Sequence, residues 1–251
     1  MVYTGLHGLI GLGVSWWTSK KKPLNISPSG IAKLAYVIGC MIPDLDLLGS
    51  IFFVVTGQGL AAATSVHRTY SHSLITIGII ILLGIIIGRL GKGKGKYQSI
   101  LVGLGLGMLT HDLFDLPYMV GVSLFWPLPI GTYIADQGTY RIGLFWDLPG
   151  GLANFNSALD FLFAGLFFYA LYVLVRRVNK ENKGLLLKIL IILSFAIFIG
   201  LGAWGLMVPA NASTFLLIYA LAGLPYLLLM IYIPYRYRRG IYAIGETGKK
   251  R

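Results

Sequence analysis

Charged residues are scarce in this chain. Only 12% of its 251 residues are Asp, Glu, Lys or Arg, whereas 56% are hydrophobic, and the mean hydropathy is +0.76. An ordinary soluble domain carries about 25% charged residues, so these values exclude that class of protein. The sequence therefore predicts an integral membrane protein that is associated with the lipid bilayer.

Acidic residues are few, and cysteine occurs once. The chain has nine acidic residues and 21 lysines and arginines, so its formal net charge is +12. In a soluble chain this excess would suggest nucleic acid, but here the basic residues mostly occupy short segments between apolar runs, as in cytoplasmic loops. We therefore expect no specific nucleic-acid partner.

The single cysteine, Cys40, excludes an intramolecular disulfide. No charge precedes the first apolar stretch, so we expect no signal peptide.

The apolar segments predict an all-α, polytopic membrane helix bundle with about six transmembrane helices. Proline removes a backbone donor, so the first of these spans should be broken at Pro43. An additional segment at 5–17 would be about 20 Å long as a helix, shorter than a hydrocarbon core of about 30 Å, and is expected to be re-entrant. The six spans are expected at 30–56, 72–88, 97–116, 157–175, 185–208 and 214–233.

The spans define one expected transmembrane domain, residues 1–235, with the motif region at 5–130. A basic cytoplasmic tail without regular structure should follow at 236–251. Ser71 is a good N-cap for a helix that starts at His72. The long connector at 117–156 contains two short Phe-Trp segments, at 124–128 and 144–148, which are typical of interfacial anchors.

The distribution of basic residues predicts the orientation. Four basic segments, at 20–22, 89–96, 176–188 and the C-terminal tail, fall on one side if every full span crosses once. That side should be cytoplasmic in a multi-pass protein of the inner (plasma) membrane. All four histidines then fall on the outer half of the membrane. We therefore expect them to form one site towards the outer face.

The stretch 110–115 places ionisable groups where an apolar run should still be membrane. His111 and Asp115 are four residues apart and share one helix face, whereas Asp112 turns aside. Such groups are costly in the membrane unless they pair, bind a metal or line a wet cavity. Beside Pro43, both Asp44 and Asp46 should begin a new half-helix, where one can ligate a metal and the other can hold a histidine.

These residues predict a metal site. Imidazole and carboxylate ligands suit a divalent zinc, manganese or iron ion, and the number of candidates allows one or two ions. A metal-bound water with a pKa of about 7 would supply the nucleophile for hydrolysis. Arg68 would bind a phosphate oxygen, Asp112 would orient a histidine or accept a proton, and Asp46 would assist catalysis, ligate or cap its helix. The candidate ligands are His7, Asp44, Asp46, His67, His72, His111 and Asp115.

Four motifs follow one another along the chain. Residues 42–46 read IPDLD, residues 67–74 read HRTYSHSL, His111 precedes Asp115 by four positions, and residues 121–127 read GVSLFWP. Together with His7 they cover about half of the chain, and in this order they resemble the YdjM/YbcI family. The resemblance implies an inner-membrane-associated, metal-dependent hydrolase, also labelled LexA-binding, that is distantly similar to zinc-dependent phospholipase C and single-strand nucleases.

The chain departs from the family patterns at three points. A family histidine is Leu47 here, a glycine is Thr69, and a Thr-Pro pair is replaced by Leu116 and Pro117. The change at Leu47 leaves fewer ligands for a second metal ion. The resemblance to phosphodiester-cleaving enzymes implies a phosphate ester as substrate, which in a membrane protein would be a lipid or a lipid-linked molecule.

Two other functions are compatible with the same residues. A transporter or channel could use the His/Asp cluster for a permeating metal ion or for protons, and broken helices suit that class as well. A non-catalytic membrane regulator could instead dock a cytoplasmic partner through the basic tail. Neither the substrate nor the oligomeric state follows from the sequence.

Overall fold

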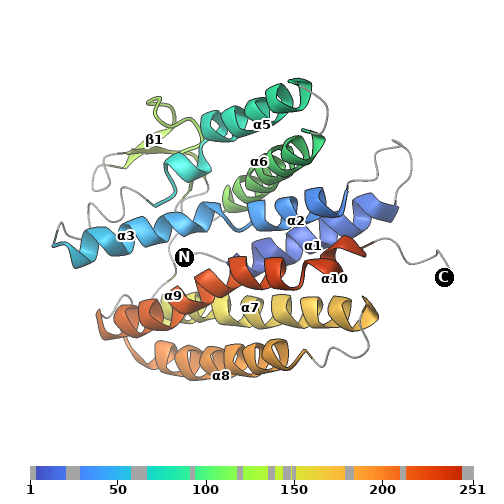
Figure 1. The fold of residues 1–251 in the computed structure, drawn as a ribbon. Helices are drawn as coiled ribbons and strands as arrows, with labels where there is room; N and C mark the ends of the chain where they lie inside the picture. The colour runs from blue at the N-terminus through green and yellow to red at the C-terminus, as the bar shows by residue number, and fades with distance from the viewer. Residues whose placement is uncertain are drawn as a thin grey trace. The chain divides into compact units, whose positions relative to one another are not determined.

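The computed structural model describes residues 4–20, 29–57, 67–90, 94–117, 121–134, 139–143, 148, 151–178, 184–209 and 213–244 (Figure 1). The chain divides into two compact units. Unit 1 comprises Met1–Val37 and Asp147–Arg251, and unit 2 comprises Ile38–Trp146. The first boundary falls inside helix α2 (Gly30–Gly39).

Unit 1 is helical wherever it is described with regular structure. Its long helix α7 packs along α8 and also contacts α1, α9 and α10, and Figure 1 shows α7 and α8 side by side. Small residues allow these close approaches, because a Cβ atom on Gly5 of α1 would lie 2.3 Å from the backbone nitrogen of Ala164 of α7. The elements are α1 (Thr4–Lys20), the first part of α2, α7 (Gly151–Val178), α8 (Leu185–Met207), α9 (Ser213–Arg236) and α10 (Arg238–Tyr242).

Two helices in the described part of the chain are long and apolar enough to cross a membrane. They are α7 and α8, which coincide with the spans expected at 157–175 and 185–208. The helix α5 (Leu74–Arg89) is apolar but has 16 residues, and α2 has ten. The number of six spans and the re-entrant position of α1 therefore stay predictions.

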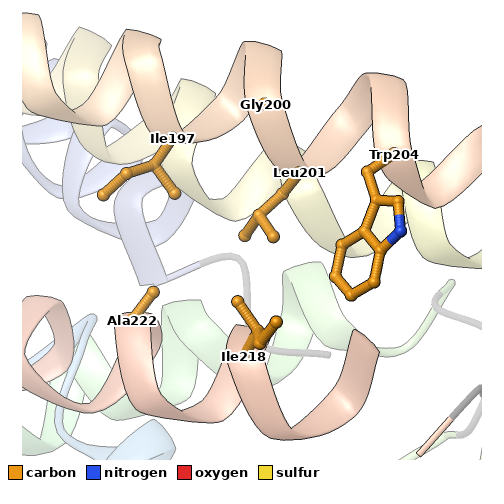
Figure 2. A pocket seen from close by; sticks show the side chains of 6 residues that line it. All are labelled: Ile197, Gly200, Leu201, Trp204, Ile218 and Ala222. Carbon is orange, nitrogen blue, oxygen red and sulfur yellow. The ribbon is translucent and has the colours of Figure 1, made fainter. Parts of the chain in front are cut away.

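An apolar groove runs between α8 and α9 (Figure 2). Ile197, Gly200, Leu201 and Trp204 of α8 line one side, and Ile218 and Ala222 of α9 line the other. None of these side chains is ionisable, so the groove supplies no group for acid–base or metal chemistry.

Unit 2 contains the broken helix predicted from Pro43. Helix α2 ends at Gly39, the 3₁₀ turn η1 (Pro43–Leu45) restarts the chain, and α3 (Asp46–Val55) continues it. After the turn η2 (Tyr70–His72), α5 packs against α6 (Gly95–Asp115). Glycines lie at this contact, since a Cβ atom on Gly105 would be 2.5 Å from a side-chain carbon of Ile81. Both η1 and η2 therefore lie at ends of packed helices.

The start of α5 differs from the sequence prediction. Ser71 does not cap this helix, because it lies within η2. Ser73 is the N-cap instead, and its Oγ accepts a hydrogen bond of 3.2 Å from the backbone N–H of Ile75. The η2 turn shifts the helix start by two residues and leaves the Ser71 hydroxyl available for other contacts.

The connector contains a short β-hairpin that the all-α prediction missed. Strand β1 (Thr132–Ile134) pairs antiparallel with β2 (Thr139–Arg141), with Tyr133 opposite Tyr140. The two rings lie 5.0 Å apart, which is a stabilising cross-strand contact. Helix α7 then begins at residue 151, earlier than expected. Most of the second Phe-Trp segment, residues 144–147, lies outside the described residues.

The basic tail also begins with regular structure. Arg238–Tyr242 form α10, in which Gly240 and Ile241 are buried. The tail was expected to lack regular structure because its composition is basic, but its apolar residues pack on the helices of unit 1. Residues 245–251 lie outside the described part.

Gly39 offers a test of the packing of α2 on α6. A Cβ atom at this position would lie 2.3 Å from the backbone oxygen of Leu104, and a backbone atom cannot move aside cheaply. We expect Gly39→Ala to destabilise the protein by about 1–3 kcal/mol, measured as a lower thermal midpoint in detergent. Gly78→Ala on α5 is the control, because nothing lies within 4 Å of its added Cβ atom. Equal midpoints for both variants would contradict this packing.

Candidate metal centre

Three segments of unit 2 bring ionisable side chains together. The first is the break before α3, the second is the loop that ends in η2, and the third is the C-terminal turn of α6. Asp44, His72 and His111 are fully buried, at 0% exposure. The side chains involved are Asp44, Asp46, His67, Arg68, Ser71, His72, His111, Asp112 and Asp115.

The helix break sets the tautomer of His111. The Nδ1 atom of this residue lies 2.8 Å from the backbone carbonyl oxygen of Cys40. A carbonyl oxygen only accepts hydrogen bonds, so Nδ1 must carry the hydrogen and donate it. In the neutral ring, Nε2 of His111 is then a bare lone pair.

A serine sets the tautomer of His72 in the same way. The Ser71 hydroxyl donates to Oδ2 of Asp46 at 2.7 Å, so its oxygen is free to accept from Nδ1 of His72 at 3.0 Å. The same Nδ1 lies 3.4 Å from Oδ2 of Asp46. Because both neighbours favour a hydrogen on Nδ1, Nε2 of His72 is also a bare lone pair.

The two lone pairs point at each other, and two carboxylate oxygens join them. The Nε2 atoms of His72 and His111 are 3.1 Å apart. Asp44 Oδ1 lies 3.5 Å from Nε2 of His111. Asp115 Oδ2 lies 3.6 Å from Nε2 of His111 and 3.7 Å from Nε2 of His72. The Nε2 atom of His72 and the carboxylate oxygens of Asp44 and Asp115 thus all lie within 3.6 Å of Nε2 of His111. When both imidazoles are neutral, these four atoms are electron-pair donors with no hydrogen among them.

This arrangement fits a metal ion. In a tetrahedral site with bonds of about 2.0–2.2 Å, neighbouring ligand atoms are separated by about 3.3–3.6 Å, close to the observed distances. Asp44, His72 and His111 each offer a ligand atom within 4.8 Å of the others, so these buried residues could hold an ion. The donor set, two imidazole nitrogens and two carboxylate oxygens, suits zinc, manganese or iron.

Asp46 holds the loop rather than facing the four-atom set. Its carboxylate contacts Nδ1 of His67 at 2.6 Å and accepts from the backbone N–H of Arg68 and the hydroxyl of Ser71, both at 2.7 Å. Its position in the first turn of α3 is also favourable for an acid. Asp46 thus orients His72 through Ser71. In metal sites, residues that hydrogen-bond to the ligands play the same part.

Arg68 has an unusual backbone and a buried charge. Its φ of 64° is the only positive value on a non-glycine residue in the described ranges, a conformation that costs about 1–3 kcal/mol. The turn aims its backbone N–H at Asp46 and its Nη2 at Oδ2 of Asp115, 3.1 Å away. The guanidinium is only 1% exposed. The loop therefore places a fixed cation beside the donor set.

Two further polar groups are buried beside the set. Neither carboxylate oxygen of Asp112 has a hydrogen-bond partner among the described residues, and the side chain interacts electrostatically with His111, Asp115 and Arg68. Asp112 therefore belongs to this region although its helix position turns it from the shared face of the other two. The Nε2 atom of His67 is likewise buried and without a hydrogen-bond partner in the described part of the chain.

His7 is the one predicted ligand outside unit 2. It lies on α1 in unit 1 and is buried. Its assignment as a metal ligand stays a prediction.

Three contributors to the site were not predicted from the sequence. The Cys40 carbonyl and the Ser71 hydroxyl set the two histidine tautomers, and Nη2 of Arg141 donates to the carbonyl of His67 at 2.7 Å. Ser71 is next to His72 in the motif, which could have pointed to it. Arg141 lies far along the chain on β2, and no sequence pattern connects it to the loop.

Comparison with known proteins identifies the family of this chain. A family model described as "YdjM inner membrane protein" matches residues 1–183. The chain belongs to the YdjM family. The match contains every residue of the site and all of unit 2, and it ends before α8. YdjM proteins are named as inner membrane proteins, which supports the expected membrane localisation, and the family description states no reaction.

Curated relatives give the same assignment. The chain is 30% identical to the inner membrane protein YbcI of Escherichia coli (strain K12) over 138 residues, which cover 54% of this chain and 71% of the relative. It is 30% identical to the inner membrane proteins YdjM of E. coli (strain K12) and Shigella flexneri over 118 residues, 45% of this chain. The chain thus spans only about half of the length of these two YdjM proteins, 50% in each case. No solved structure gives a significant match.

Ser71 allows a test of the tautomer argument. Removing its hydroxyl takes away the hydrogen-bond acceptor that lies 3.0 Å from Nδ1 of His72. The imidazole ring can then present a protonated Nε2 to the donor set. We expect Ser71→Ala to weaken zinc binding by about 10–100-fold, measured by competition with a chromogenic chelator. Ser50→Ala, which removes another buried hydroxyl of unit 2, is the control and should keep the affinity. An unchanged affinity in Ser71→Ala would contradict the role of this hydroxyl.

Proposed function

We propose that this chain is a membrane-embedded, metal-dependent hydrolase that acts on a phosphate ester, in a lipid or a lipid-linked substrate. The observation that carries the proposal is the convergence of two imidazole lone pairs and two carboxylate oxygens in a fully buried position. Such a group is expensive in a membrane protein without a bound cation.

The metal ligands in this proposal are Asp44, His72, His111 and Asp115. Zinc is the first choice, with manganese and iron as alternatives, because the donors are mixed nitrogen and oxygen. When bound, a divalent metal lowers the pKa of its water to about 7 and so supplies hydroxide at neutral pH. We assign one ion to these residues. A second ion would have to use Nε2 of His67, since Leu47 stands where the family has a histidine.

Arg68 is the proposed phosphate-binding residue. It shares Oδ2 of Asp115 with the two imidazoles, at 3.1 Å from its own Nη2. A phosphate oxygen carries the same charge as that carboxylate oxygen and can take its place on the planar guanidinium fork. The strained backbone of Arg68 keeps this cation at the site before the substrate arrives.

Asp112 is the proposed proton acceptor. Its carboxylate is buried next to Arg68 and Asp115, and in the described part of the chain its oxygens make no hydrogen bond that would occupy them. A carboxylate in this position can take the proton of the attacking water, which in other enzymes contributes about 10²–10⁴-fold to the rate. Asp46 assists by holding Ser71 and the loop in place.

The lipid character of the substrate rests on the membrane assignment. The family consists of proteins named for the inner membrane, and α7 and α8 have the length and composition to cross it. In our proposal the chain crosses with six spans, α1 is re-entrant, and the four basic segments face the cytoplasm. The metal centre then lies towards the outer face.

Metal content is the first test of this function. After mild detergent extraction and dialysis, we expect about one equivalent of transition metal per chain by inductively coupled plasma mass spectrometry. The double variant His72→Ala/His111→Ala should lose the ion, and Asp44→Asn should retain little.

The matched control is Asp160→Asn on α7, which removes a carboxylate from unit 1 and should retain the ion. Circular dichroism checks that all variants keep their helices. A wild-type protein without any transition metal would contradict the proposal.

Hydrolysis itself is tested with bis(p-nitrophenyl) phosphate and with a fluorescent phosphatidic acid. Asp112→Asn should reduce kcat by about 100-fold or more while metal content stays unchanged, because the proton acceptor is lost and the ligands remain.

Arg68→Lys should raise KM about tenfold or more, since an ammonium does not reproduce the bidentate fork. Lys94→Gln, an exposed change at the start of α6, is the control.

The same experiments separate hydrolysis from transport. Zinc or manganese uptake into proteoliposomes that depends on Asp44, without hydrolysis of either substrate, would assign the cluster to a permeating ion instead. Phosphoesterase activity that survives His111→Ala would also rule out the proposed centre.

A further inference from the structure

Six exposed cations gather at one end of unit 1. They come from the C-terminal turn of α7, the first turn of α8, the end of α9 and the short helix α10, whose position beside the end of α7 is visible in Figure 1. We call them the basic end surface. They are Arg176, Arg177, Lys188, Arg236, Arg238 and Arg239.

Packing of α10 on α7 brings the two sequence segments together. A Cβ atom on Gly240 would lie 3.3 Å from Val175, so α10 sits directly against the last turns of α7. At the same end, the buried Lys33 of α2 donates from Nζ to the carbonyl oxygen of Ile244 at 2.7 Å. The surface is therefore assembled by the fold and is not a loose basic tail.

Tyrosines hold these cations in place. The Tyr172 ring lies beneath both Arg176 and Lys188, at 5.9 and 5.7 Å from its centroid, and so joins α7 to α8. Arg238 stacks on Tyr235 at 4.9 Å. Each contact keeps a cation near an aromatic face and restricts its rotamers, which lowers the entropy cost of binding an anion.

The six cations have no acidic partners in the described structure. None of them forms an ion pair with a carboxylate among the described residues. In the adjoining sequence, only Glu181 and Glu246 are acidic, whereas Lys180, Lys183 and the last three residues add further positive charge. Among the described residues, the positive charge of this surface is therefore not neutralised by carboxylates.

The position of the basic end surface, at the ends of two apolar helices, indicates which kind of anion it can meet. Helices α7 and α8 are long and apolar enough to cross a membrane, and the basic end surface lies where α7 ends and α8 begins. The end of a membrane-crossing helix lies at the level of the lipid headgroups, where tyrosine is favoured and where phosphates are abundant. Arginine forks match phosphate oxygens, and juxtamembrane cations attract anionic lipids.

We propose that the basic end surface binds the headgroups of anionic phospholipids, such as phosphatidylglycerol, in the cytoplasmic leaflet. A soluble acidic partner would have to displace phosphates that are already present at this level, so the lipid is the favoured occupant. This inference does not depend on the metal centre, which belongs to unit 2.

Native mass spectrometry of the full-length protein tests the proposal with phosphatidylglycerol and phosphatidylcholine as probes. Wild-type protein should retain phosphatidylglycerol in preference to phosphatidylcholine. The double variant Arg176→Gln/Arg238→Gln should bind phosphatidylglycerol about 30-fold more weakly, because each cation near an anionic lipid contributes about fivefold. Its metal content should equal that of the wild type.

The matched control is Lys94→Gln/Lys96→Gln, which removes two exposed charges from unit 2. It should change the affinity for phosphatidylglycerol by less than about threefold. Equal loss in both double variants, or no preference of the wild type between the two lipids, would overturn the proposal. So would binding of soluble poly-L-glutamate through Arg176 and Arg238 in a protein that does not discriminate between the lipids. Circular dichroism and thermal midpoints show whether the variants remain folded.

Discussion

The hydrogen bond from Nδ1 of His111 to the carbonyl of Cys40 is the interaction on which the rest of the site depends. That carbonyl lies at the helix break, where α2 ends at Gly39 and the chain restarts at Pro43. The break thus provides the acceptor that directs Nε2 of His111 towards His72. A continuous helix would consume the same carbonyl in its own hydrogen bonds.

The second histidine is oriented by an equally specific contact. Asp46 receives the hydroxyl hydrogen of Ser71, and the serine oxygen faces Nδ1 of His72. These outer contacts decide which nitrogen of each ring faces the common point. With the tautomers reversed, two N–H groups would meet at 3.1 Å and no cation could be held. The chemistry of the centre is therefore decided by residues that do not face it.

The two units differ in the kinds of residues that they contain. Unit 2 contains the cluster of buried histidines and aspartates, whereas unit 1 contains the two helices with membrane-crossing length. The family match ends at residue 183, so α8, α9 and α10 lie beyond it. The basic end surface includes residues from both sides of this limit, such as Arg176 and Arg238. This surface is thus built partly from segments outside the family match.

The sequence by itself determined the membrane class, the helix break at Pro43, the family and the candidate residues of the site, because hydropathy, proline and short motifs are local properties. The tertiary structure decided which atoms meet: the tautomers set by Cys40 and Ser71, the position of Asp46 behind His72, and the contact of Arg141 with the loop. It also decided the β-hairpin, since three-residue strands are too short to show an alternating pattern. The contacts of His111 with Cys40, of Asp46 with Ser71 and of Arg141 with His67 join residues 25 to 74 positions apart, and such contacts leave no trace in local spacing.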